Sequence, residues 1–341
     1  MGMVGMSTAG PRGRRAAIGG AVTAGVAGAY ALGTARRRGR ARNTPGPPVP
    51  VVTDEEFLAD ERYVQDGFED ATIEGWKTRV FDRGAGDTIV FVPIIRGLEV
   101  VYARQLRAFA GTHRVLLYER DEIFDRPVYV ASRVAEIRKL LDHVGVERAH
   151  IVGLGDAGVP TFDFGRAHPE RALSLTSLCL GPRYRMPPYW LTERVLNPMT
   201  ERLPVERVVP AAAIRAWVVR MTAGEGALPK HLIRHMVSHI NEPMRVHKYS
   251  VMPVTHHHEM APWAHTLRPP TLLIGRDDDP LAPAAELHEL AGLLPDCRGV
   301  HILRDGGRFV TYTWAERVTQ LLREFFATVT APTPGPTARV T

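Results

Sequence analysis

The sequence predicts an α/β fold, in which a mostly parallel sheet carries helices on both faces and a helical cap is inserted late in the chain. Short, continuous apolar runs recur from position 78 onward, as expected for strands that are covered on both faces. Segments with helical spacing of apolar residues alternate with these runs, which indicates parallel strands joined by helices. The interval 183–268 breaks the alternation and is rich in Pro, Met, Arg and His.

The individual elements follow from these two periodicities. We expect strands, in chain order, at 88–93, 114–118, 150–153, 172–180, 271–275 and 300–303. We expect helices at 99–110, 130–144, 159–167 and 314–326, with further helical pieces at 211–221 and 230–241 inside the irregular interval. The helix at 130–144 has the clearest pattern, because Val134, Ile137 and Leu141 fall on one face.

This order of elements divides the chain into five parts. A basic, Ala- and Gly-rich segment with a Pro-rich linker occupies 1–53, and a flexible tail occupies 330–341. The core of the fold is split into a first part at 54–182 and a second part at 269–329. The intervening segment, 183–268, is expected to form a cap, or lid, over the carboxyl edge of the sheet.

The net charge of +6 comes from the N-terminal segment alone. Residues 1–53 contain eight arginines and no acidic residue, which leaves 35 basic and 37 acidic side chains and a net charge of −2 for the rest of the chain. The folded part therefore offers no basic face for nucleic acid, and we expect no nucleic-acid partner. The two cysteines, Cys179 and Cys297, are too few for a disulfide framework and are expected to be ordinary thiols.

The segment 16–35 is uncharged for twenty residues and has arginines on both sides. Such a length would just span the hydrocarbon core of a bilayer, although Ala and Gly make the insertion weak. More arginines follow the segment than precede it, which favours membrane association with a cytoplasmic body. The alternatives are export after signal cleavage near 29–31 and a disordered arm.

Several motifs lie at the ends of the expected strands. The strand at 150–153 leads into Gly153-Leu-Gly155-Asp156-Ala157-Gly158, and one helix later the sequence is His168-Pro-Glu-Arg. Asp279-Pro-Leu-x-Pro follows a later strand, and Asp-Gly-Gly-Arg308-Phe precedes the last helix. In order and spacing this series resembles the α/β-hydrolase family over most of 78–328. The resemblance implies that fold and, in its usual members, a Ser-His-Asp hydrolase.

The first departure from that family concerns the nucleophile. The family's G-x-S-x-G turn mounts the serine on a strained backbone between strand and helix, with small neighbours two residues away. We place Gly155 at this position because its flanks, Gly153 and Ala157, are both small. The alternative is Asp156, as in relatives with an aspartate nucleophile, but Leu154 would then crowd the turn. Glycine tolerates the backbone conformation and cannot form a covalent intermediate.

The second departure concerns the base. Where the family has its histidine, this sequence has Arg308, whose guanidinium cannot act as a general base. The acid position is retained within 277–279, where the Asp-Pro-Leu-x-Pro frame favours Asp279 and leaves Asp278 as the alternative. We expect Asp279 and Arg308 to form an ion pair in place of a proton relay. The oxyanion loop at 93–97 is also degraded.

Other motifs are weaker. The glycines of 153–158 match G-x-G-x-x-G only formally, because that fingerprint belongs to the first βα turn, so we expect no nucleotide cofactor. The histidines at 256–258 lie on what we take to be an extended segment, where at most two can converge. His231, His235 and His239 recur at helical spacing opposite an apolar face, and are expected to face solvent or a cleft. No H-E-x-x-H motif accompanies either group, and we expect no metal.

Two functions remain open. The first is a pseudoenzyme: an α/β-hydrolase-fold protein that lacks nucleophile and base and binds a small apolar ligand or a protein partner in the capped cleft. The sequence is loosely similar to the maspardin-like branch, which shares a Gly-Gly-x-Phe stretch and a Leu-Leu-Asp-His segment (140–143 here) but keeps its serine. The second is a non-standard lyase or ester hydrolase that uses cap histidines or another nucleophile; Ser174, Ser177 and Ser250 are the candidates near strand ends.

Overall fold

A computed structural model describes residues 52–122, 125–184, 191–222, 230–277, 279–304 and 307–330. Within these ranges the core is one eight-stranded sheet with the order β1-β2-β4-β3-β5-β6-β7-β8. The strands are β1 (Phe68–Ile73), β2 (Trp76–Arg83), β3 (Thr88–Val92), β4 (Arg114–Tyr118), β5 (Ala149–Leu154), β6 (Ala172–Leu178), β7 (Thr271–Arg276) and β8 (Cys297–Leu303). The pairings from β4 to β8 are parallel, and β2 is antiparallel to both β1 and β4. The predicted α/β class is confirmed.

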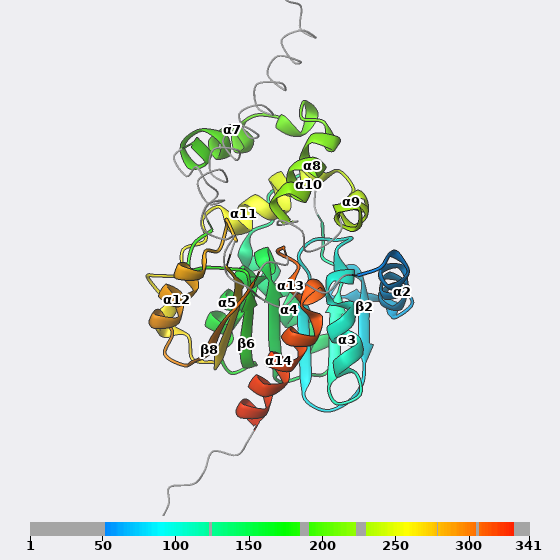
Figure 1. Ribbon diagram of the computed structural model, residues 1–341, viewed down its shortest axis with the longest axis vertical. Helices are drawn as coiled ribbons and strands as arrows, with labels where there is room; N and C mark the ends of the chain where they lie inside the picture. The colour runs from blue at the N-terminus through cyan, green and yellow to red at the C-terminus, as the bar shows by residue number, and fades with distance from the viewer. Residues whose placement is uncertain are drawn as a thin grey trace, which may run out of the picture.

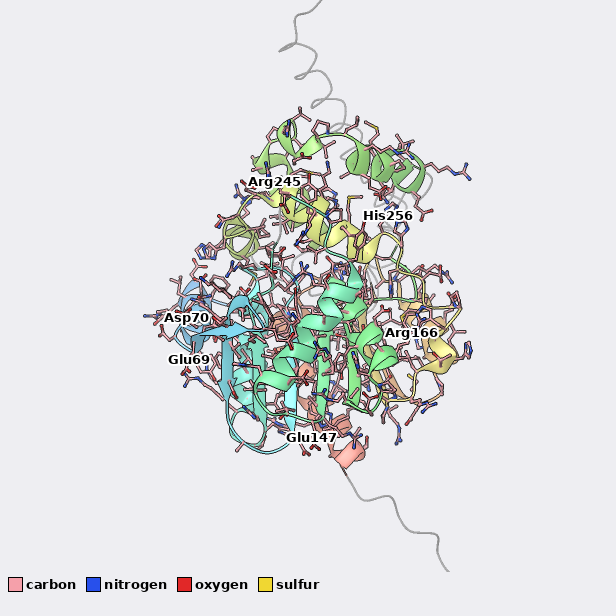
Figure 2. All side chains as sticks on the ribbon, turned by 180° about the vertical axis from the view of Figure 1, so that it is seen from behind. Glu69, Asp70, Glu147, Arg166, Arg245 and His256 are labelled. Atoms are coloured by element: carbon pink, nitrogen blue, oxygen red, sulfur yellow. The ribbon has the colours of Figure 1, made fainter. Side chains whose placement is uncertain are left out.

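Helices cover both faces of the sheet. On one face lie α3 (Ala103–Phe109), the short α13 (Val310–Thr313) and α14 (Ala315–Thr330), in front of the strands in Figure 1. The other face carries α4 (Val130–His143) and α5 (Gly158–Ala167), which come to the front in the reverse view of Figure 2. α12 (Ala284–Leu293) packs beside β7 and β8. β3 and β5 are buried along their whole length, which explains their continuous apolar sequences.

The first three elements of the core, which begin before position 78, were not predicted from the sequence. These are the helix α2 (Asp54–Gln65) and the β1–β2 hairpin. β1 has the sequence FEDATI and lies at the edge of the sheet with mostly exposed or half-buried side chains. An edge strand of this kind needs no apolar run, so periodicity could not reveal it.

The segment between β6 and β7 forms the cap. Its helices are α7 (Asn197–Arg202), α8 (Ala211–Thr222), α9 (Lys230–Ser238), α10 (Pro243–Val246) and α11 (Met252–Thr255), with irregular turns at Thr192–Leu196, Val205–Arg207 and His247–Val251. In Figure 1 they lie together beyond one end of the strands of the sheet. In Figure 2, Arg245 and His256 of the cap lie at the end of the molecule opposite Glu147, which lies two residues before the start of β5. The cap therefore covers the carboxyl end of β5.

One buried histidine gives the core a specific response to acid. His150 on β5 is fully buried, its Nδ1 lies 2.7 Å from Ser174 Oγ, and its ring stacks on Phe326. Burial, with smaller effects of His113 and Arg148, lowers the pKa of His150 to about 3. An unfolded histidine takes up a proton below pH of about 6.5, so this group destabilises the fold as the pH falls from there toward 3.

We expect His150→Gln to weaken this dependence on pH. Between pH 7 and pH 5 the free energy of unfolding should fall by about 2 kcal/mol more in the parent than in the variant, because only the parent's unfolded state gains that proton. Urea denaturation at both pH values measures the difference, and buried acids such as Glu99, whose raised pKa acts in the opposite sense, cancel in it. His265→Gln, at an exposed position, is the control. Equal pH dependence in the parent and His150→Gln would contradict the prediction.

Candidate functional site

The turn after β5 has the tight geometry that a nucleophile elbow requires. The chain passes from Leu154 through a single 3-10 turn, Gly155–Ala157, into α5. Gly155 has φ +57°, the left-handed conformation in which glycine is favoured. A Cβ on Gly153 would lie 2.5 Å from the carbonyl oxygen of Ala157. The positive φ falls on Gly155 and not on Asp156, as the preferred register requires.

Arg308 occupies the space in front of Gly155. A Cβ added to Gly155 would lie 2.9 Å from Nη2 of Arg308, too close for a normal contact. The Arg308 side chain is almost fully buried, so the guanidinium cannot simply swing into solvent. The position where a nucleophile's side chain would extend is therefore filled by a cation.

The expected contact between Arg308 and Asp279 is present. Nη1 of Arg308 lies 3.4 Å from Oδ1 of Asp279, and Nη2 donates a hydrogen bond to the carbonyl oxygen of Cys179 at 3.2 Å. The backbone N–H of Arg308 also donates to the carbonyl oxygen of Thr222 in α8, at 2.9 Å. Arg308 thus joins the carboxyl edge of the sheet to the cap.

The carboxylates of Asp279 and Asp156 keep Arg308 charged. Burial by itself would lower the pKa of Arg308, but Asp279, Tyr184 and Asp156 together raise it above its ordinary value. A guanidinium with a raised pKa has no basic nitrogen at any ordinary pH, so Arg308 cannot accept a proton from a nucleophile or from water.

Asp279 is completely buried and has several polar neighbours. Its Oδ1 accepts hydrogen bonds from the backbone N–H groups of Leu281 (2.8 Å) and Ala282 (3.2 Å), and Oδ2 lies 3.6 Å from Nε of Arg276. Two cations and two amides therefore surround one carboxylate. The alternative acid, Asp278, lies outside the described residues.

Asp156 forms the other acidic side of the site. Its Oδ1 lies 3.8 Å from Nη2 of Arg308, and the side chain is partly exposed to the cavity. Tyr184 hydrogen-bonds to Asp156, and burial, followed by the charge of Asp156, raises the pKa of Tyr184 well above its ordinary value. Tyr184 is therefore a neutral donor beside the carboxylate.

Gly155, Asp156, Tyr184 and Arg308 lie at the floor of a cavity of about 130 Å³ between the core and the cap. The polar side chains that line it are Asp156, Tyr184, Thr192, Glu193, Asn197, Thr222, His247, Thr255, His256 and Arg308. The remaining walls are largely apolar and come from both layers: Ile94, Ile95, Leu98, Leu154, Ile214, Trp217, Val218, Ile240, Val246, Val251, Met252, Leu281 and Phe309. An apolar cavity with a few polar groups at one end is the usual form of a small-molecule site.

His247 is a cavity residue that the sequence analysis missed. It follows α10 directly, and its ring meets that of Trp217 edge to face, with centroids 5.4 Å apart. Removal from water lowers the pKa of His247 to about 4, against the opposing effect of the Asp156 charge. The imidazole is therefore neutral at ordinary pH and can accept or donate a hydrogen bond. It lies in no local motif, so no sequence signal marked it.

The histidines that the sequence did mark lie elsewhere. The expectation of an extended segment at 256–258 was wrong: His256 continues directly from α11, and the rings of His256 and His257 stack with centroids 4.5 Å apart. His256 lines the cavity but its Nδ1 lies 2.6 Å from Oε1 of Glu201. Among the described residues, Arg308 and not a histidine faces Asp279.

The three candidate serines do not line the cavity. Ser174 and Ser177 are buried within β6, where the Ser174 hydroxyl contacts His150 and the Ser177 hydroxyl lies against Gly158. Ser250 is buried in the cap and lies 3.3 Å from Nη2 of Arg133. No serine of the described ranges borders the cavity. The threonines that do border it, Thr222 and Thr255 among them, donate to helix carbonyl oxygens.

The proposed membrane segment, 16–35, lies outside the described residues, as do all of 1–51 and 331–341. Across the part of the chain that the structure describes, no helix combines the length and apolarity needed to cross a bilayer.

Comparison with known proteins gives relatives that are hydrolases. No family model matches the chain. It is 26% identical over 187 residues to a poly(3-hydroxyalkanoate) depolymerase of Ectopseudomonas oleovorans, across 55% of this chain and 64% of that protein. The chain spans less than two thirds of the length of the curated relatives it matches.

Solved structures agree on the architecture. A thermophilic esterase from Thermogutta terrifontis superimposes with a TM-score of 0.63 at 19% identity, covering 77% of this chain and 98% of the esterase. The enol-lactonase from Burkholderia xenovorans LB400 gives a TM-score of 0.62 at 17% identity, covering 76% and 100%. Both similarities concern the fold.

Proposed function

This chain has the α/β-hydrolase fold, and we propose that it is a non-catalytic protein of that fold, which binds a small, largely apolar molecule in the cavity beneath its cap. One observation carries the proposal. The guanidinium of Arg308 fills the space in front of Gly155, so neither a nucleophile nor a general base faces Asp279. The covalent mechanism of a Ser-His-Asp hydrolase therefore has neither its nucleophile nor its base at this position.

The cavity suggests the kind of ligand. Its walls are mostly aliphatic and aromatic, which favours an apolar body. At and beneath its floor, the charges of Arg308 and Arg276 are offset by the carboxylates of Asp279 and Asp156, so this end of the site does not demand a charged ligand. Neutral donors and acceptors, His247 and Tyr184, can orient one polar group. A short ester, lactone, alcohol or amide with an apolar tail fits this chemistry.

We expect p-nitrophenyl butyrate to bind to the purified protein without being hydrolysed. Binding should change the tryptophan fluorescence, because Trp217 lines the cavity, and Trp217→Phe should remove most of that change. Release of p-nitrophenol should stay at the rate of the buffer alone. A fluorophosphonate should label no serine, because none of those described borders the cavity.

Two results would overturn this function. The first is fluorophosphonate labelling of one serine together with ester turnover that disappears when that serine is replaced. The second is an absence of any fluorescence response to p-nitrophenyl butyrate and to its hydrolysis product butyrate, since both would fit a small apolar site.

A second candidate is favoured by His247 and Asp156. A neutral imidazole and a carboxylate on opposite layers of one cavity are the groups needed for general acid–base chemistry without a covalent intermediate. Such an enzyme would be a lyase, or a hydrolase that activates water. Turnover that survives fluorophosphonate treatment and is lost in both His247→Gln and Asp156→Asn would favour this candidate over the binding protein.

A further inference from the structure

A cluster of side chains that can bind a metal ion lies outside the cavity, where the cap meets the first helix of the core. Glu61 of α2 faces His235 of α9 and His239, the residue just after α9. Oε1 of Glu61 lies 3.0 Å from Nδ1 of His239, and Oε2 lies 3.6 Å from Nε2 of His235. The proposed ligand-binding function uses none of these three residues.

The cluster is held from the cap side by α9. The apolar side chains of Ile233, Met236 and Val237 are fully buried in the main core, which fixes the rotation of the helix. His235 and His239 are four residues apart, so they project from one face of a helical segment, opposite these buried residues. The edge of the Phe57 ring packs against His235, with centroids 5.2 Å apart.

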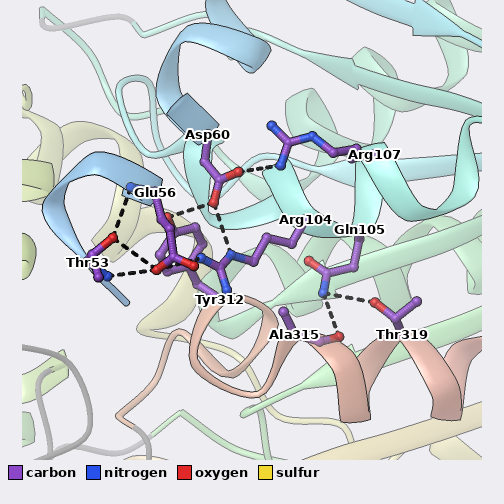
Figure 3. Close-up of polar contacts among 9 residues, drawn as sticks. All are labelled: Thr53, Glu56, Asp60, Arg104, Gln105, Arg107, Tyr312, Ala315 and Thr319. Carbon is purple, nitrogen blue, oxygen red and sulfur yellow. Dashed lines mark hydrogen bonds and ion pairs between the residues drawn. The ribbon is translucent and has the colours of Figure 1, made fainter. Parts of the chain in front are cut away.

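On the other side of the cluster, α2 is fixed in place by several polar contacts. Figure 3 shows Asp60 buried between Arg104, Arg107 and the hydroxyl of Tyr312. A reciprocal capping box between Thr53 and Glu56 stabilises the start of the same helix. Glu61 follows Asp60 directly, so its Cα is anchored while its carboxylate reaches the two histidines.

We propose that Glu61, His235 and His239 bind a Zn²⁺ ion, which joins the cap to the N-terminal helix of the core. The ligand atoms of the three side chains all lie within 4.8 Å of one another. In a tetrahedral site with bonds of 2.0–2.1 Å, ligand atoms are separated by about 3.3 Å. The two Glu61–histidine distances, 3.0 Å from Oε1 to His239 and 3.6 Å from Oε2 to His235, involve different carboxylate oxygens. Rotation of the Glu61 carboxylate, together with the imidazoles, would have to bring one oxygen and both nitrogens to about that separation, from a starting set that lies within 4.8 Å.

The ligand set selects the class of metal. Two imidazoles and one carboxylate suit Zn²⁺ and its first-row neighbours, whereas Mg²⁺ and Ca²⁺ prefer oxygen ligands. Three protein ligands leave the fourth position to water, which the exposure of the cluster allows. This inference departs from the sequence-based expectation of no metal, which considered the histidines without Glu61.

A second trio provides a matched control. Glu201, His256 and His257 also bring their ligand atoms within 4.8 Å of one another. Here the two histidines are adjacent in sequence and their rings stack nearly parallel, at 24°. This arrangement lacks two histidines projecting from one helix face, so we expect it to contribute little.

The test is Zn²⁺ binding by the full-length, untagged chain, measured by competition with a chromophoric chelator. We expect one tight Zn²⁺ per chain. His235→Gln and His239→Gln should each weaken it by at least about tenfold, since losing even an outer-shell partner commonly costs that much. His257→Gln should leave it unchanged. Zn²⁺ should raise the Tm of the parent and of His257→Gln equally, and raise the Tm of His239→Gln by less at the same Zn²⁺ concentration.

Any of three results would overturn the Zn²⁺ site. Either no Zn²⁺ binds to the parent, or His235→Gln and His239→Gln bind Zn²⁺ as the parent does, or His257→Gln alone abolishes Zn²⁺ binding. Both histidines of the proposed site are partly exposed, so the variants should fold, and equal Tm values without metal verify this. Glu61→Gln gives an independent check, because it keeps the volume of the side chain and removes the anionic ligand. None of these measurements depends on whether the cavity binds an ester.

Discussion

Arg308→Ala is expected to lower the free energy of unfolding by about 3 kcal/mol, because it removes one partner of a buried ion pair and leaves the carboxylate of Asp279 with one neighbouring cation instead of two. Asp279 has no exposed surface, and Arg308 has little. The loss should fall at the low end of the range for broken buried pairs, since Arg276 and two backbone amides still face the Asp279 carboxylate. Urea denaturation at pH 7 measures it.

Arg298→Ala is the control for this prediction. Arg298 pairs with Asp296 on the surface, where both side chains are partly exposed to solvent, so its loss should change stability little. A variant Arg308→Ala that is no less stable than Arg298→Ala would show that the buried pair at Asp279 does not hold the edge of the sheet and the cap together.

The double substitution Gly155→Ser with Arg308→His is expected to create esterase activity. It would return a hydroxyl to the elbow and an imidazole to the loop that faces Asp279, which already accepts two backbone hydrogen bonds. The introduced histidine can take the proton of the introduced serine, which the guanidinium cannot do. Turnover of p-nitrophenyl butyrate should exceed that of the parent by about 10²-fold or more, the usual contribution of a positioned general base.

The single substitutions are the controls. Gly155→Ser alone should stay inactive and lose stability, because its side chain would meet Nη2 of Arg308 and its backbone would keep φ +57°. Adding Asp279→Asn to the double variant should abolish most of the new activity. If the double variant is folded and still inactive, the loop at Arg308 does not occupy the position of a catalytic base.

Both predictions concern the space that Arg308 occupies in front of Gly155. A Cβ on residue 155 would lie 2.9 Å from Nη2 of Arg308, so a side chain there would require the guanidinium to shift. A side chain at 155 and the guanidinium of Arg308 therefore compete for the same space.

Much of this site and of the central sheet could be predicted from local sequence. Continuous apolar runs identified the central strands, and the small flanks Gly153 and Ala157 identified Gly155 as the elbow residue, which carries the positive φ. The frame around Asp279 was enough to expect its contact with Arg308. These features are local because a covered strand and a tight turn each restrict the residues at their own positions.

Other features depended on how distant segments pack. His247 belongs to the cavity only because the cap lies over β5, and no spacing in the sequence marks it. Glu61 meets His235 and His239 only because α9 buries its apolar face in the core beside α2. The edge strand β1 was missed because half-exposed positions place few demands on residue type. Periodicity records which face of an element is buried, whereas the partner across that interface is set by the packing of the whole chain.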